Sequence, residues 1–185
     1  MTDDQRFASR RTDVLTFQTP VLQEDLTLAG PVVADLLVSL SSTDADFIVK
    51  VIDVFPDDFS YTPEASLPVR GHDNPPTYPM GGYQMLVHAE VMRGRFRQSF
   101  EHPVPFKPGK IEEVKWAVPD VAHTFKKGHR LMIQIQSSWF PLVDRNPQKF
   151  VDIYTADDSD FTKETIRVWH DRDHPSKIIL PVYKN

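Results

Sequence analysis

The sequence predicts an all-β domain of two packed sheets. Sixteen prolines stand against seven glycines, and many short apolar runs are separated by turn residues, which is typical of strands rather than helices. Several of these runs alternate apolar and polar residues with the period of two that gives a strand one core face. A proline-rich connection over residues 56–82 favours a Greek-key or jelly-roll order over a simple meander.

The length and composition of the chain limit the number of domains and the classes of function that it can have. We expect residues 1–12 to be a tail or linker remnant and residues 13–185 to form one domain, because 185 residues suffice for a single core. The absence of cysteine excludes disulfides, thiolate zinc sites and a cysteine nucleophile. A net charge of -5 argues against nucleic-acid binding. No apolar run is long enough for a membrane span or an export signal, so we expect no membrane partner.

The strand candidates follow one another along the chain. A turn at Gly30-Pro31 is expected to separate two early strands. The segment 47–55 is apolar on both faces apart from Lys50 and Asp53, which predicts a strand covered on both sides. A bend at Gly94 is expected to lead into another strand that ends near Phe100. Nine or ten strands are expected in all, including residues 14–17, 26–29, 32–40, 47–55, 83–91, 111–118, 131–136, 165–170 and 178–182.

One short helix is expected after residue 118. Asp120 is a suitable N-cap residue, Val121 and Phe125 have the i, i+4 spacing of neighbours on a helix, and Gly128 provides a stop. This segment supplies the helical turn of an otherwise all-β prediction.

The run from Gly128 to Pro147 contains the main candidate site. Its first part alternates strictly and predicts a half-buried strand, which Pro141 and Pro147 keep from extending. Aromatic and guanidinium groups on a proline-stiffened turn are common anchors of interfaces and pockets. The alternative is a structural cap on the sandwich with Arg145 paired locally. The candidate residues here are Trp139, Phe140, Asp144, Arg145 and Asn146.

No catalytic constellation is expected. The chain lacks the G-x-S-x-G turn of α/β-hydrolases. Ser137 and Ser138 have His123, His129 and His170 as conceivable partners, but their place at a strand end favours hydroxyls bonded to backbone. The segment 170–174 and the aspartates at 44–46 and 157–160 match no ligand spacing, so we expect no metal or cofactor. Alternating Arg93, Arg95 and Arg97 predict one basic strand face.

Several segments together resemble a known family. Val14-Leu15-Thr16-Phe17-Gln18-Thr19-Pro20, the segments 26–31 and 43–57, and Ser137-Ser138-Trp139-Phe140-Pro141 through Arg145-Asn146-Pro147 are similar to the C-terminal domain of X-Pro dipeptidyl-peptidase and cocaine-esterase-like hydrolases. Met80-Gly81-Gly82-Tyr83-Gln84 and Phe125-Lys126-Lys127-Gly128 look closest to the branch of α-amino acid ester hydrolases and glutaryl-acylase-like enzymes.

The resemblance implies a galactose-binding-like jelly roll that follows an α/β-hydrolase domain carrying a Ser-Asp-His triad. It implies a catalytic domain as partner in the same chain, a role in walling the active site, and a contribution to homo-oligomer contacts. No triad residue falls on this sequence, and an exported or periplasmic parent enzyme is left open. A free-standing module for carbohydrate or another small ligand is the alternative. The residues expected to face substrate or the catalytic domain are Phe47, Tyr78, Trp139, Phe140, Asp144, Arg145 and Asn146.

Overall fold

The structure, a computed structural model, describes residues 3–59 and 80–184. In these ranges it contains strands almost exclusively, with one four-residue helix and two 3-10 turns. The elements are α1 (Arg6–Ser9), β1 (Leu15–Gln18), β2 (Leu26–Leu40), β3 (Asp46–Val54), β4 (Gln84–Arg93), η2 (Gly94–Phe96), β5 (Glu112–Phe125), β6 (Arg130–Gln136), η3 (Asp158–Asp160), β7 (Ile166–Trp169) and β8 (Lys177–Ile179).

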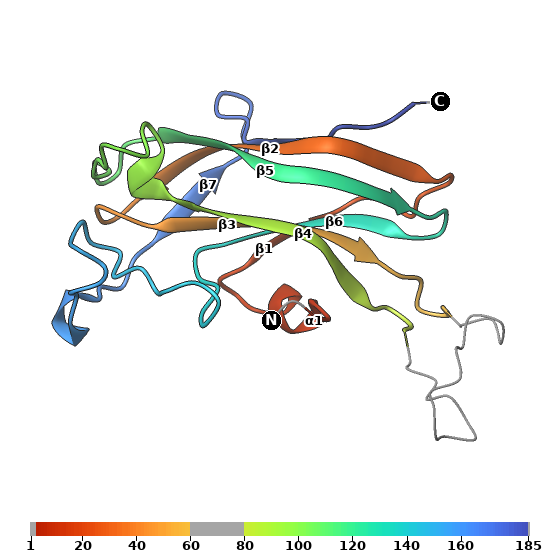
Figure 1. Cartoon of the computed structure of the whole chain (residues 1–185), viewed down its shortest axis with the longest axis horizontal. Helices are drawn as coiled ribbons and strands as arrows, with labels where there is room; N and C mark the ends of the chain where they lie inside the picture. Colours follow the sequence, from red (N-terminus) through yellow and green to blue (C-terminus); the bar gives the residue numbers. More distant parts are fainter. Residues whose placement is uncertain (1–2, 60–79, 185) are drawn as a thin grey trace, which may run out of the picture.

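The strands form two antiparallel sheets that lie face to face (Figure 1). The first sheet has the order β1-β6-β3-β4, and the second has the order β5-β2-β7 with β8 also paired to β2. Strands that follow one another in sequence cross between the sheets, as β4, β5 and β6 do, which is the connectivity of a jelly-roll sandwich. The predicted all-β sandwich is therefore confirmed.

The core lies between the two sheets and is built by alternate residues of the central strands. On β3 the inward residues Phe47, Val49 and Val51 are fully buried, as the period of two requires. The main contributions from the other strands are Val32, Ala34, Leu36 and Val38 of β2, Val114, Trp116 and Val118 of β5, and Leu131, Ile133 and Ile135 of β6.

The central strands of the first sheet, β3 and β6, are buried on their second face as well. Ile48, Lys50 and Ile52 point away from the core, yet none of them is exposed. The same holds for Met132 and Gln134, so the expectation that 131–136 is a half-buried strand is wrong. The N-terminal segment and Trp139 cover this face, and Figure 1 shows α1 lying beneath the first sheet.

The N-terminal segment 3–12, expected to be a tail, contains α1 and packs partly on the domain. Ala8 and Gln5 are fully buried. The backbone N–H of Gln5 donates to the carbonyl of Gln84 at 2.9 Å, which ties the segment to the start of β4.

The expected helix after Asp120 is wrong, because β5 continues as a strand to Phe125. Residues 121–125 pair with residues 26–30 of β2, so backbone pairing to a neighbouring strand overrides a local spacing that also suits a helix. The expected turn at Gly30-Pro31 is likewise a β-bulge inside one long strand. Gly30 has φ 122°, a conformation that side-chain-bearing residues rarely adopt.

Other expected strands differ at their ends. Gly94 begins the 3-10 turn η2, and the described residues from there to Phe100 form no strand. Gly94 itself has no room for a side chain, since a Cβ there would lie 2.6 Å from the Ala45 carbonyl. The closing strand is shorter than predicted, and Val182 contributes only an isolated bridge to Leu28.

Candidate functional site

The candidate site is the loop of residues 139–146, here called the rim loop, which follows β6 at one end of the sandwich. Its two ends are anchored in different ways. Trp139 is buried against the outer face of the first sheet, and Asn146 is buried in a polar network at the start of β3. Between these anchors the chain turns through a cis peptide bond at Phe140-Pro141 and projects into solvent. The rim loop is therefore fixed at both ends and exposed in the middle.

The first anchor is the contact between Trp139 and Lys50. The ammonium group of Lys50 lies 4.6 Å from the centre of the Trp139 ring and donates a 2.8 Å hydrogen bond to Gln5 Oε1. Phe7 approaches the same group at 5.8 Å. Burial, with a further contribution from Arg11, lowers the pKa of Lys50 to about 8. A buried ammonium held by aromatic rings and an amide thus supports one end of the rim loop.

This lowered pKa makes stability depend on pH. Between pH 8 and 10.5 the unfolded chain binds a proton on Lys50 that the folded chain has released, so the free energy of unfolding should rise with pH. We expect a rise of up to about 3 kcal/mol from this group across that window. Urea unfolding of the wild type and Lys50→Met at pH 7 and pH 10 measures it. An equal pH dependence in the two proteins would contradict the expectation.

The second anchor is a buried network of charges around Asp44. Its Oδ2 atom accepts hydrogen bonds from Arg95 Nε at 2.8 Å and from Asn146 Nδ2 at 3.0 Å. Asn146 Nδ2 also donates to Asp46 Oδ1 at 2.9 Å. Burial raises the pKa of Asp46 to about 6, against the opposing effect of the Asn146 hydrogen bond. One asparagine thus ties the rim loop to two carboxyl groups of the sheet.

The exposed middle of the rim loop gathers apolar side chains around an arginine. Phe140 and Leu142 are 58% and 57% exposed, and Phe161, which follows η3, is 37% exposed. The guanidinium of Arg145 lies over the rings of Phe161 at 4.9 Å and Phe140 at 5.8 Å. We call Phe140, Leu142, Arg145 and Phe161 the tip cluster. Arg145 makes no hydrogen bond or ion pair to any residue that the structure describes.

The other predicted site residues have different positions. Asp144 is exposed beside Arg145. Phe47 is in the core, 1% exposed, with its ring 6.2 Å from that of Phe106. Tyr78 lies outside the described residues. The structure therefore brings Trp139, Phe140, Arg145 and Asn146 together in one loop and places Phe47 away from its surface.

A second polar cluster, not predicted from the sequence, lies among the ends of three strands. Asp53 on β3 is 2% exposed, with its two oxygens 2.8 Å from His129 Nδ1 and 2.9 Å from His123 Nε2. Phe55 packs against His129 with ring centres 4.7 Å apart. Two of the histidines considered as partners for a serine are thus occupied with this aspartate, and Ser137 Oγ, which is buried, has no hydrogen-bond partner.

The basic residues near Gly94 do not form one strand face. Arg93 approaches Asp46 at 3.8 Å, Arg95 binds Asp44, and Arg97 pairs with Glu112 at 2.7 Å. Each arginine therefore serves a separate local contact. Across residues 3–59 and 80–184, no group of three or more histidine or acidic side chains is arranged to hold a metal ion, and no helix is long and apolar enough to cross a membrane.

Comparison with known proteins decides the family. Residues 3–179 match the family described as the X-Pro dipeptidyl-peptidase C-terminal non-catalytic domain. This chain belongs to that family. The chain is accordingly a non-catalytic C-terminal domain of the cocaine-esterase-like hydrolases, as the resemblance in sequence implied.

The relatives of this non-catalytic domain are longer proteins. The cocaine esterase of Rhodococcus sp. (strain MB1 Bresler) is 32% identical over 98% of this chain and 27% of its own length. An aminopeptidase of Thaumarchaeota archaeon superimposes with a TM-score of 0.85 at 44% identity, over 99% of this chain and 28% of its own. An α-amino acid ester hydrolase superimposes with a TM-score of 0.86 at 41% identity, over 98% of this chain and 27% of its own. The chain thus spans about a quarter of the relatives it matches.

Proposed function

We propose that this domain packs, within one polypeptide, on an α/β-hydrolase catalytic domain and helps to shape its active site. The parent would be a serine hydrolase for ester or amide substrates, or of the dipeptidyl-peptidase type. The tip cluster is the observation that supports this proposal best. The relatives named as an esterase, an aminopeptidase and an ester hydrolase, each about four times as long as the matched region, support the hydrolase partner.

The composition of the tip cluster suits a protein interface. Exposed aromatic and aliphatic side chains around an arginine are enriched among the residues that dominate binding energy. Because Trp139 and Asn146 hold both ends of the rim loop, little conformational entropy remains to be lost when a partner binds. A preformed, apolar and singly charged projection of this kind favours docking to a fixed neighbour.

The position of the exposed aromatics favours docking over the alternative of a carbohydrate module. Phe140, Phe150, Tyr154 and Phe161 are all exposed and lie on loops between β6 and β7, and among the described exposed aromatic residues only Phe17 of β1 lies in a strand. A sugar platform would require aromatic rings spread along a strand face. The outward face of β5 instead carries residues such as Glu113, Lys115 and Ala117.

The test uses the full-length parent enzyme together with this 185-residue chain. The double substitution Phe140→Ser and Leu142→Ser should leave the melting temperature of the isolated domain within about 2 °C, because both side chains are exposed. In the parent it should lower kcat/KM by at least about tenfold or separate the melting of the two domains. Tyr183→Ser is the matched control, since Tyr183 is 59% exposed and its backbone N–H binds the carbonyl of Thr27 near the start of β2, whereas Asn146 of the rim loop binds Asp44 beyond the end of β2.

If the double substitution changes neither kcat/KM nor the melting of the parent enzyme, the tip cluster is not part of the docking surface. Assembly into a homo-oligomer is a further part of the proposal. Sedimentation of the parent with and without the double substitution separates that role from docking within one chain, because only an intersubunit contact changes the mass observed.

A further inference from the structure

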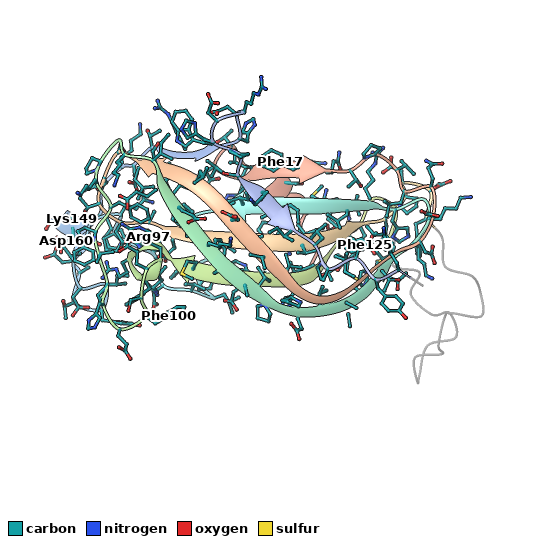
Figure 2. The ribbon with its side chains drawn as sticks, turned by 90° about the horizontal axis from the view of Figure 1, so that it is seen from above. Phe17, Arg97, Phe100, Phe125, Lys149 and Asp160 are labelled. Carbon is teal, nitrogen blue, oxygen red and sulfur yellow. The ribbon has the colours of Figure 1, made fainter. Side chains whose placement is uncertain are left out.

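The sandwich is open along one side, between β1 of the first sheet and β7 and β8 of the second. Leu15 and Phe17 of β1 pair with the inward-facing Ile135 and Ile133 but remain 42% and 45% exposed, although the ring of Phe17 lies 6.2 Å from that of His170. Figure 2 shows Phe17 at this edge of the molecule. The core residues Ile133 and Ile135 lie beneath it. We call this open side the seam.

Three cavities follow one another along the seam. The first, of about 330 Å³, is lined by Phe17, and the second, of about 140 Å³, is lined by Leu15. These two share Ile135 and Val168. The third, of about 340 Å³, shares Asp13 with the second. The cavities therefore form one continuous groove that runs along β1 and past the turn before it.

The spacing along the groove is that of an extended chain. Leu15 and Phe17 are two residues apart on β1, which separates them by about 6.7 Å on one face of the strand, and Asp13 lies in the turn that precedes β1. A second strand laid beside β1 would present its inward side chains at the same interval. Two inward side chains would then meet the first two cavities, and a third would lie at the cavity beside the turn that contains Asp13.

The edge of β1 is available for such a strand. β1 pairs with β6 on one side, and among the described residues no strand pairs with it on the other. An unpaired strand edge presents backbone N–H and C=O groups that a further strand can use. Pairing of this kind provides affinity, and pockets for alternate side chains provide selectivity.

The two ends of the groove differ in chemistry. The first two cavities are mainly apolar, with Leu36, Val168 and Ile178 among their walls, and His170 and Lys177 supply the polar part of the first. The third contains two carboxyl groups, those of Asp13 and Glu164, and no basic residue. Asp13 pairs with Arg11, which lies outside the cavity lining. Glu164 Oε1 accepts a 2.9 Å hydrogen bond from the Ser42 backbone N–H, whereas its buried Oε2 has no partner. Burial raises the pKa of Glu164 to about 7, and a cation bound beside it would favour its charged form.

We propose that the seam binds an extended peptide segment of another protein, which adds antiparallel to β1. The segment carries the pattern apolar-x-apolar-x-Lys or Arg from its N- to its C-terminus. The two apolar side chains fill the cavities at Phe17 and Leu15, and the basic side chain meets Asp13 and Glu164 in the third. This binding site is independent of the tip cluster.

Titration calorimetry of the 185-residue chain tests the proposal. The probe is a capped peptide with the core Val-Thr-Val-Thr-Lys, and the comparison peptides replace Lys with Glu or both Val with Ser. We expect binding of the first peptide at least about tenfold tighter than of either comparison. Phe17→Lys should weaken it by a similar factor. Thr16→Lys and Gln18→Lys, on the opposite face of the same strand, should change it less than about twofold.

Several results would overturn the proposal. Equal affinity for the Lys and Glu peptides would show that the acidic third cavity does not recognise the basic side chain. If Phe17→Lys left the affinity unchanged, the peptide would bind elsewhere on the domain. Absence of binding to the wild-type chain would leave the seam without a peptide ligand. Sedimentation showing a dimer that Phe17→Lys dissociates would make a second copy of the chain the occupant. All arms use the isolated domain, so they do not depend on docking to a catalytic domain.

Discussion

Replacing Asp53 with alanine is expected to lower the free energy of unfolding by about 3 to 5 kcal/mol, one of the two largest effects expected of a single substitution in this domain. The carboxylate is 2% exposed and receives His129 Nδ1 at 2.8 Å and His123 Nε2 at 2.9 Å. Its removal leaves the two imidazole N–H groups without their acceptor, one of them fully inside the fold. Unpaired buried donors retain their full desolvation cost.

The position of Asp53 explains why the loss should be global rather than local. Asp53 belongs to β3 of the first sheet, and His123 belongs to β5 of the second, so the cluster joins the two layers directly. Urea unfolding followed by tryptophan fluorescence and by far-UV circular dichroism should give coincident transitions with a lower midpoint.

Two substitutions make the Asp53 measurement specific. Asp53→Asn preserves size and one acceptor oxygen, so it should cost less than alanine. Lys115→Ala removes a surface ion pair to Asp35 and should cost less than about 1 kcal/mol, since Lys115 is half exposed. A loss below about 1 kcal/mol for Asp53→Ala would mean that the histidines contribute little to joining the sheets.

The strands that the sequence predicts best are those whose alternation and packing agree. Residues 131–136 alternate strictly, and Leu131, Ile133 and Ile135 do point into the core. The burial of their other face could not be predicted, because it depends on α1 and Trp139, which arrive from distant parts of the chain. Alternation reports the direction of a side chain, and only tertiary structure reports what covers it.

The wrong helix at residues 121–125 has a similar origin. Val121 and Phe125 satisfy the i, i+4 spacing of a helix, yet both are buried from an extended strand that pairs with β2. The β-bulge next to Pro31 changes the register between the strands, so residues before and after it cannot share one simple pattern. The i, i+4 spacing of Val121 and Phe125 alone could not show whether this segment is a helix or a strand.

The sequence could predict which loop forms the candidate site but not which side chains hold that loop in place. Phenylalanine and arginine on a proline-containing loop predict an exposed projection of the kind found at interfaces, whereas Trp139 of the same loop is buried. The groups that hold this loop are remote in sequence, since Asn146 meets Asp44 across 102 residues. Lys50 and Asp53 were likewise visible only as polar interruptions of an apolar strand. Such interruptions in a strand buried on both faces are a usable signal for a buried polar cluster.

The second large effect is expected at Arg95. Replacing it with leucine should lower the free energy of unfolding by about 3 to 5 kcal/mol, because Asp44, which is fully buried, loses its cationic partner. Asn146 alone would then donate to Asp44 Oδ2. Urea unfolding of Arg95→Leu and of Lys149→Ala, which removes an exposed ion pair to Asp160, gives the comparison.

A double-substitution cycle identifies the source of that loss. If the uncompensated charge is the cause, adding Asp44→Asn to Arg95→Leu should restore at least about 1 kcal/mol, although two native groups are now missing. If lost packing of the Arg95 stem is the cause, the two losses should add instead.

Asn146→Ala separates the network from the rim loop. This substitution removes no charge, so we expect only a modest loss of stability. Weakened docking in the parent enzyme would then show that Asn146 holds the tip cluster in place. Unchanged docking would show that Trp139 alone is a sufficient anchor.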